Sequence, residues 1–155
     1  MSKEKVTLRI VANYGHQFLG LPLDARTDEV APLFVSLVAR GKKQGYAVGD
    51  RVEVTITAEN QGAIEKTLTR DNMFYRSEFN KQKNLAANIS QVAIVCATEP
   101  VFSEELLGRA LICAEVAEIP VLIILNKIDV IEILEAARET MQLYRDLGYA
   151  TIEIS

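Results

Sequence analysis

The sequence predicts a small closed β-barrel followed by an incomplete parallel α/β sheet. In roughly the first seventy residues, short segments of alternating apolar and polar side chains are separated by turn residues. After about residue 84 the apolar residues form continuous runs that alternate with segments of helical periodicity, which is typical of a parallel sheet. Hydrophobic residues make up 49% and charged residues 25% of the chain, as in globular proteins with a buried core.

Five short strands are expected in the first part. In Arg51–Thr57, the side chains of Val52, Val54 and Ile56 alternate with polar residues, the pattern of a strand with one wet face. Five strands without a long helix favour a small barrel, of which the OB-fold is the commonest five-stranded form. An SH3-like barrel is the alternative, because the pattern does not determine strand order. The other expected strands are 5–12, 17–23, 33–39 and 63–68.

The second part reads as strand, helix, strand, helix, strand. Ser103 can cap the first helix, and Gly148 can end the second. Fully apolar strands favour a parallel sheet covered on both faces. Three strands are few for a sheet of this kind, so we expect that the α/β domain is incomplete in this chain. The expected strands are 91–97, 121–125 and 149–154. The inner face of the first helix is expected to consist of Leu106, Leu107, Ala110, Leu111 and Ala114. That of the second helix is expected to consist of Leu134, Ala137, Met141 and Tyr144.

The two parts differ in charge. Residues 1–83 carry 13 Lys and Arg against 10 Asp and Glu, whereas residues 84–155 carry 4 against 11. A positive first part favours a polyanionic partner such as RNA, and chance scatter of surface charge is the alternative. We expect an OB-fold domain at 1–70, a connector of helix or fixed loop at 71–90, and the front part of an α/β domain at 91–155.

Composition excludes several other classes of protein. No apolar run approaches the roughly 20 residues that cross a bilayer, and no secretory signal is recognisable, so we expect a cytoplasmic protein without a membrane partner. Cys96 and Cys113 lie among apolar neighbours and have no partner at metal-ligand spacing. His16 has no neighbouring nucleophile. The sequence therefore predicts neither a metal site nor catalytic residues within this chain.

The stretch "VLIILNKIDV" places polar residues directly after a buried strand. Ligands of doubly wound sheets bind beyond the carboxyl ends of the strands. A carboxylate at Asp129 can accept hydrogen bonds from guanine N1–H and its amine, which adenine cannot donate. The Lys127 stem can lie along the purine face, and the Asn126 amide can bond the ring edge. The alternative is a polar turn that caps the next helix.

A phosphate-binding loop of the form GxxxxGK[ST] is missing. Gly15 and Gly20 have the right separation, but Leu21 and Pro22 follow them within a predicted barrel hairpin. We therefore expect that the chain as given does not hydrolyse GTP by itself.

Three stretches together resemble one family: "VGDRVEV", "YRSEFNKQKNLAANISQVAIVCATEPVFSEELLGRALICAE" and "VLIILNKID". In this order they are similar to the ribosome-small-subunit-dependent GTPase A family, RsgA or YjeQ, over residues 5–155. The resemblance implies an N-terminal OB-fold, a circularly permuted GTPase domain and a C-terminal zinc-binding module, of which this chain covers the front half. Permutation places the base-recognition motif ahead of the phosphate-binding loop, so we expect a truncation before that loop.

The resemblance also assigns roles. Asn126, Lys127 and Asp129 match the guanine-recognition motif, and Ser155 matches the first serine of the next guanine-binding motif. The implied cofactors are GTP or GDP with Mg²⁺, and zinc only in the module beyond this chain. The implied partners are the small ribosomal subunit and its rRNA, bound late in maturation by a monomer that hydrolyses GTP there.

Basic residues occur where contact with RNA needs them, because Lys and Arg neutralise phosphates. Tyr14, Phe74 and Tyr75 can stack on bases, but the favoured interpretation is a core position, since small barrels need large side chains to fill them. A non-enzymatic RNA-binding OB-fold module with a structural α/β appendage is the second hypothesis. The RNA-binding candidates are Arg40, Lys42, Lys43, Arg51, Arg70, Arg76, Lys81 and Lys83.

Overall fold

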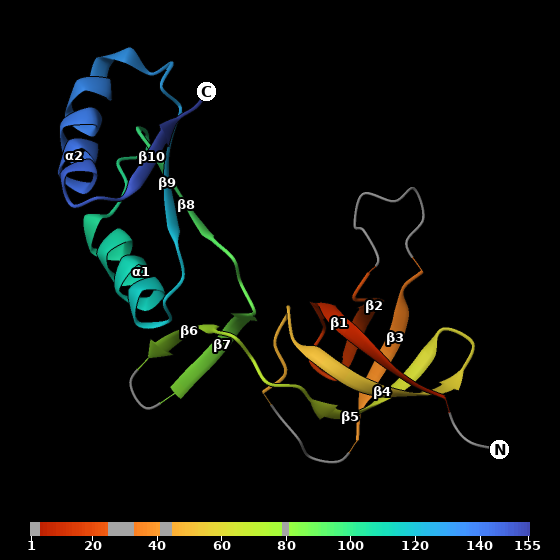
Figure 1. The fold of residues 1–155 in the computed structure, drawn as a ribbon. Helices are drawn as coiled ribbons and strands as arrows, with labels where there is room; N and C mark the ends of the chain where they lie inside the picture. Colours follow the sequence, from red (N-terminus) through yellow and green to blue (C-terminus); the bar gives the residue numbers. More distant parts are fainter. Residues whose placement is uncertain (1–3, 25–32, 41–44, 79–80) are drawn as a thin grey trace. The chain divides into compact units, whose positions relative to one another are not determined.

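The computed structural model describes residues 4–24, 33–40, 45–78 and 81–155 (Figure 1). Contacts between Cα atoms divide the chain into two compact units, Met1–Ile89 and Ser90–Ser155.

The first unit contains a closed five-stranded barrel. Its order is β1-β2-β3-β5-β4, with β4 closing onto β1 (Figure 1). Neighbouring strands are antiparallel except β3 and β5, which are parallel. This is the strand order of the OB-fold, so the predicted fold is confirmed. The strands are β1 Lys5–Asn13, β2 Gln17–Pro22, β3 Val35–Ala39, β4 Arg51–Ala58 and β5 Gln61–Thr67.

Alternating side chains fill the barrel. Val52 and Val54 are fully buried, as their spacing predicts, whereas Ile56 is only partly buried beside a shift in the pairing of β4 with β5. Phe18 packs edge-to-face on Tyr46, with 5.3 Å between ring centroids. The buried core is Leu8, Ile10, Phe18, Val35, Leu37, Tyr46, Val52, Val54 and Ile64.

The residues after the barrel form a β-hairpin. The sequence predicts a helix or a fixed loop in this connector. It consists of β6 Met73–Glu78 and β7 Lys81–Ala87. The Ala87 amide donates to the Val48 carbonyl at 2.8 Å. Gly49 has a φ of 91°, and a Cβ there would collide with the Ala87 carbonyl. Only glycine allows so close an approach of the two backbones.

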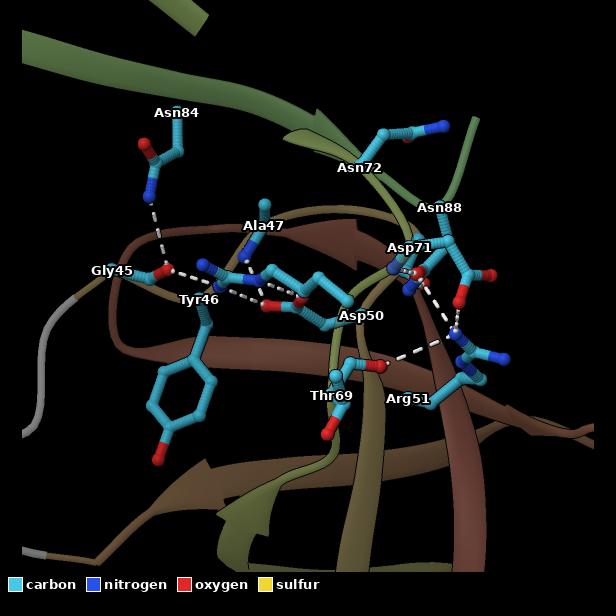
Figure 2. Close-up of polar contacts among 12 residues, drawn as sticks. Gly45, Tyr46, Ala47, Asp50, Arg51, Thr69, Asp71, Asn72, Asn84 and Asn88 are labelled. Carbon is cyan, nitrogen blue, oxygen red and sulfur yellow. Dashed lines mark hydrogen bonds and ion pairs between the residues drawn. The ribbon is translucent and has the colours of Figure 1, made fainter. Parts of the chain in front are cut away.

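An ion pair between buried Asp50 and half-buried Arg70 holds the segment after β5 against the loop before β4. Asp50 is fully buried, and its oxygens accept from Arg70 Nε at 2.6 Å and Nη2 at 2.8 Å (Figure 2). The Ala47 amide also donates to Asp50, and Arg70 donates to the Gly45 carbonyl. The hydrogen bonds to Asp50 raise the pKa of Arg70. The pair thus satisfies a carboxylate that burial would otherwise destabilise.

Arg51 and Asn88 join the end of the hairpin to the barrel. Arg51 Nη2 donates to Asn88 Oδ1 at 3.0 Å and to the Thr69 carbonyl at 3.2 Å (Figure 2). Asn88 also accepts from the Asp71 amide and donates to the Gly49 carbonyl. Arg51 completes the joint through an ion pair with Asp71 at 2.8 Å. These bonds make the hairpin part of the first unit.

The second unit is a three-stranded parallel sheet in the order β10-β9-β8. Ser103 caps the first helix by accepting from the Leu106 amide at 3.3 Å, and Gly148 follows the second with a φ of 93°, as predicted. No described helix has the length and apolarity that crossing a bilayer requires. The elements are β8 Val92–Ala97, α1 Glu104–Val116, β9 Val121–Asn126, the 3₁₀ turn η1 Ile131–Ile133, α2 Leu134–Asp146 and β10 Ala150–Glu153.

Both helices cover the same face of this sheet (Figure 1). Their buried residues share one cluster with Ile123 and Leu125 of β9. On the opposite face Val95 is 61% exposed and Ile152 is 44% exposed. Coverage of both faces is therefore not seen in the described residues. Leu106 is also exposed, not inward as predicted, because the inner stripe of α1 runs through Leu107, Leu111 and Ala114.

The Asp50–Arg70 pair predicts a specific loss of stability. Arg70→Ala leaves the buried carboxylate without its cation, and should lower the free energy of unfolding of the barrel by about 3 kcal/mol. Denaturation followed through the NMR signals of barrel amides measures this change. Lys83→Ala, which removes an exposed cation from the hairpin, should change it by less than about 0.5 kcal/mol. Equal effects of the two substitutions would contradict the structural role of the pair.

Candidate guanine-recognition loop and basic barrel surface

The polar residues after β9 emerge at the carboxyl edge of the sheet. Ile123 and Leu125 are buried, so the strand is anchored in the core up to Asn126. Lys127 then adopts a left-handed conformation with a φ of 63°. The Val130 amide donates to the Lys127 carbonyl at 3.1 Å and closes a turn that contains Asp129. A buried strand and a tight turn thus place Asn126, Lys127 and Asp129, three of the four predicted guanine-binding residues, at one edge of the sheet.

Ser155 lies against this turn. Its hydroxyl donates to Asp129 Oδ1 at 2.9 Å. The backbone of Ile154, just before Ser155, is also hydrogen-bonded to the end of β9 and the turn. The Ile128 amide donates to the Ile154 carbonyl, and the Ile154 amide donates to the Leu125 carbonyl. Asp129 is exposed, and it forms no ion pair within the described part of the chain. Its carboxylate therefore faces solvent, where a ligand can reach it.

Two residues after β8 contact the same loop, and sequence reasoning did not single them out. The Thr98 hydroxyl donates to the Lys127 carbonyl at 2.8 Å. Lys127 Nζ donates to the Glu99 carbonyl at 2.7 Å. The signal for both was available, because they directly follow an apolar strand that pairs in parallel with β9, and such strands end at the same edge.

The predicted RNA-binding residues fall into different environments. Arg51 and Arg70 are engaged in the joint between barrel and hairpin. Arg40 is exposed after β3 and pairs with Glu65 at 2.8 Å. A hydrogen bond from Thr55 and the charge of Arg40 outweigh burial and lower the pKa of Glu65.

The remaining basic candidates lie on the hairpin or outside the described residues. Arg76 on β6 lies opposite Lys83 on β7 in the strand register, and both residues are exposed. Lys81 begins β7. The side chain of Lys81 and the whole of Lys42 and Lys43 lie outside the described residues.

None of the three aromatic candidates belongs to the barrel core. Tyr14 is 71% exposed in the turn between β1 and β2, so the favoured core interpretation is wrong for it. The turn is closed by the hydrogen bond from the Tyr14 amide to the Gln17 carbonyl. Asn13 Nδ2 donates to the Tyr46 carbonyl at 3.1 Å, which ties this turn to the segment after 41–44. Phe74 and Tyr75 are half-buried on β6 and lie outside the barrel core, so the core interpretation is wrong for them too.

Comparison with known proteins decides the family. The sequence profile of the RsgA GTPase family matches residues 67–155, more than half of the chain. The chain belongs to the RsgA GTPase family. It is similar to proteins named small ribosomal subunit biogenesis GTPase RsgA, with 44% identity over 152 residues in Burkholderia pseudomallei (strain K96243) and 51% over 122 residues in Ralstonia pickettii (strain 12J).

The chain spans about half the length of these RsgA relatives. It covers 46% of the Burkholderia protein and 39% of the Ralstonia protein, while 98% and 79% of this chain are matched. The matched segment 67–155 contains Asn126, Lys127, Asp129 and Ser155.

Solved structures agree on the fold of this RsgA-family chain. YjeQ from Thermotoga maritima matches with a TM-score of 0.70, and YloQ, a circularly permuted GTPase, with 0.66. Each match is 23% identical in sequence and covers 98% of this chain and 52% of the other.

Proposed function

We propose that this chain is the RNA-binding and guanine-recognising part of a GTPase that acts in the biogenesis of the small ribosomal subunit. The observation that carries the proposal is the exposed Asp129 carboxylate, held at the exit of β9 and bonded by Ser155. The names of the RsgA relatives support the ribosomal role.

The loop suits guanine for a chemical reason. A carboxylate has only acceptor sites, and guanine offers two adjacent donors at N1 and its exocyclic amine. Adenine offers an acceptor at N1, which a carboxylate repels. The bond from Lys127 Nζ to the Glu99 carbonyl anchors the far end of the lysine stem, which is then available as an apolar surface for the purine ring. The base is thus read by Asp129 and supported by Lys127.

The phosphates and their Mg²⁺ need other groups. The described residues contain no set of three or more His, Cys, Asp or Glu side chains placed to hold a metal. Mg²⁺ at a nucleotide is held mainly by the phosphates with one or two protein side chains, and no step of hydrolysis is assigned to the described residues. Within the proposed GTPase, this chain contributes base recognition.

The basic end of the barrel suits RNA. The turn that carries exposed Tyr14 is tied to the segment after 41–44 through Asn13 and Tyr46, and Arg40 precedes that segment. Because Gln17 pairs with Val38, the Tyr14 turn before β2 and Arg40 directly after β3 lie at the same end of the barrel. Stacking on the ring combined with phosphate neutralisation is a common way to bind single-stranded RNA.

The guanine assignment is tested by Asp129→Asn. The amide places a donor where guanine also donates, so GDP affinity should fall about 10- to 100-fold while ADP binding stays unchanged. NMR titration of the chain with each nucleotide measures both affinities. Asp146→Asn, at an exposed acid at the end of α2, serves as the matched control. A wild-type chain that binds GDP and ADP alike would refute the proposal.

The RNA assignment is tested by changing Arg40, Lys42 and Lys43 together to Ala. Binding to small ribosomal subunits should weaken, and the slope of log affinity against log salt should become shallower by about 2 to 3, close to one unit per phosphate contact. Filter binding across a salt series measures this slope. The control removes three cations elsewhere, at Lys5, Lys66 and Arg109. An unchanged slope in the first variant, or the same change in both, would contradict the assignment.

Stacking by Tyr14 is tested separately. Tyr14→Ala removes the exposed ring and should weaken binding to single-stranded RNA by about tenfold, since stacking on one base contributes about 1–3 kcal/mol. Tyr14→Phe keeps the ring and should bind within about twofold of the wild type. The comparison uses fluorescence anisotropy with a labelled oligonucleotide. If both variants bind like the wild type, Tyr14 does not stack on RNA.

A further inference from the structure

Lys127 has an unusual backbone conformation between the residues that would read the base. Its φ of 63° lies in the left-handed region, which costs a residue with a Cβ about 1 kcal/mol or more. Such a conformation persists only where neighbouring groups hold it. The contacts that hold Lys127 therefore also determine where Asn126 and Asp129 point.

Thr98 makes those contacts from the neighbouring strand. It follows β8 directly, and only 2% of its surface is exposed. Its amide donates to the Asn126 carbonyl at 3.2 Å, and its hydroxyl donates to the Lys127 carbonyl at 2.8 Å. One buried residue thus binds two successive carbonyls, on either side of the left-handed Lys127 Cα.

The Lys127 carbonyl links Thr98 to the acidic residue. It also accepts from the Val130 amide at 3.1 Å, the bond that closes the turn containing Asp129. The Thr98 hydroxyl therefore binds the same Lys127 carbonyl that accepts the turn-closing hydrogen bond from Val130. Valine has nearly the same shape as threonine, so it could continue the fold, but it cannot donate this hydrogen bond.

We propose that Thr98 is a positioning residue for guanine recognition, whose hydroxyl keeps Lys127 left-handed and thereby directs Asp129 toward the base. This inference rests on the proposed function, because it assigns to Thr98 an effect on the guanine-reading loop. Thr98 touches no nucleotide in this role and acts through the Lys127 carbonyl. Its loss should affect preference for guanine over adenine, and not nucleotide binding in general.

The test compares Thr98→Val with two other variants of the chain. Thr98→Ser keeps the hydroxyl. Thr140→Val is the matched control, because the Thr140 hydroxyl also donates to a carbonyl, that of Ala136 in α2. GDP and ADP affinities are measured by NMR titration, and the hydrogen exchange rate of the Val130 amide reports on the turn without any nucleotide.

For Thr98→Val we expect GDP affinity to fall about tenfold, because the Lys127 carbonyl loses a partner, while ADP affinity stays within twofold. Exchange of the Val130 amide should become at least tenfold faster. Thr98→Ser and Thr140→Val should stay within about threefold of the wild type in both measurements. If Thr98→Val fails to fold, as shown by loss of its thermal transition, Thr98→Ala supplies the same comparison without an added apolar methyl against the carbonyl.

Wild-type GDP affinity in Thr98→Val would overturn the inference, whether or not Val130 exchange becomes faster. An equal loss of GDP affinity in Thr140→Val would overturn it too. These results differ from failure of the proposed function, in which the wild-type chain itself would show no preference for GDP over ADP. That result would remove the guanine assignment and this inference together.

Discussion

Parallel pairing of β8, β9 and β10 is the constraint on which the candidate guanine site depends. Strands that run in the same direction bring their carboxyl ends to one edge of the sheet. Thr98, Asn126 and Ser155 are far apart in the sequence, yet each lies at or just beyond such an end. Hydrogen bonds then connect the three segments directly. The sheet therefore supplies the geometry, and the loop after β9 supplies the chemical groups.

In the barrel unit, the same type of side chain serves two purposes. Arg51 and Arg70 satisfy carbonyls and carboxylates at the joint with the hairpin, so their charges are used within the fold. Arg40 and Lys83 are exposed, and Arg40 also forms an ion pair with Glu65 at the surface. The excess of basic residues in the first half of the chain therefore overstates the charge that a polyanion meets. Burial of Asp50 explains the use of Arg70, because a buried carboxylate requires a cation. Arg51 is held instead by Asn88, the Thr69 carbonyl and Asp71.

Local patterns predicted most of the elements. Alternation placed Val52 and Val54 inside the barrel, and helical spacing placed Leu111 and Met141 in the second core. Each pattern depends on side chains a few residues apart, which the sequence shows directly. The hairpin of β6 and β7 was not predicted. Its end is fixed by hydrogen bonds of Ala87 and Asn88 to Val48 and Gly49, which lie in a distant part of the chain. Leu106 was misplaced because helical periodicity alone does not say where the inner stripe ends.

By itself, the sequence determined which chemical groups this protein presents: a carboxylate two residues beyond a lysine after a buried strand, and basic residues around a small barrel. Only the tertiary structure decided which of these groups are available. It placed Ser155 on Asp129 and Thr98 on Lys127, used Arg51 and Arg70 internally, and left Tyr14 exposed. The physical reason is that availability depends on burial and hydrogen-bond partners, which come from segments remote in the sequence and close together only in the fold.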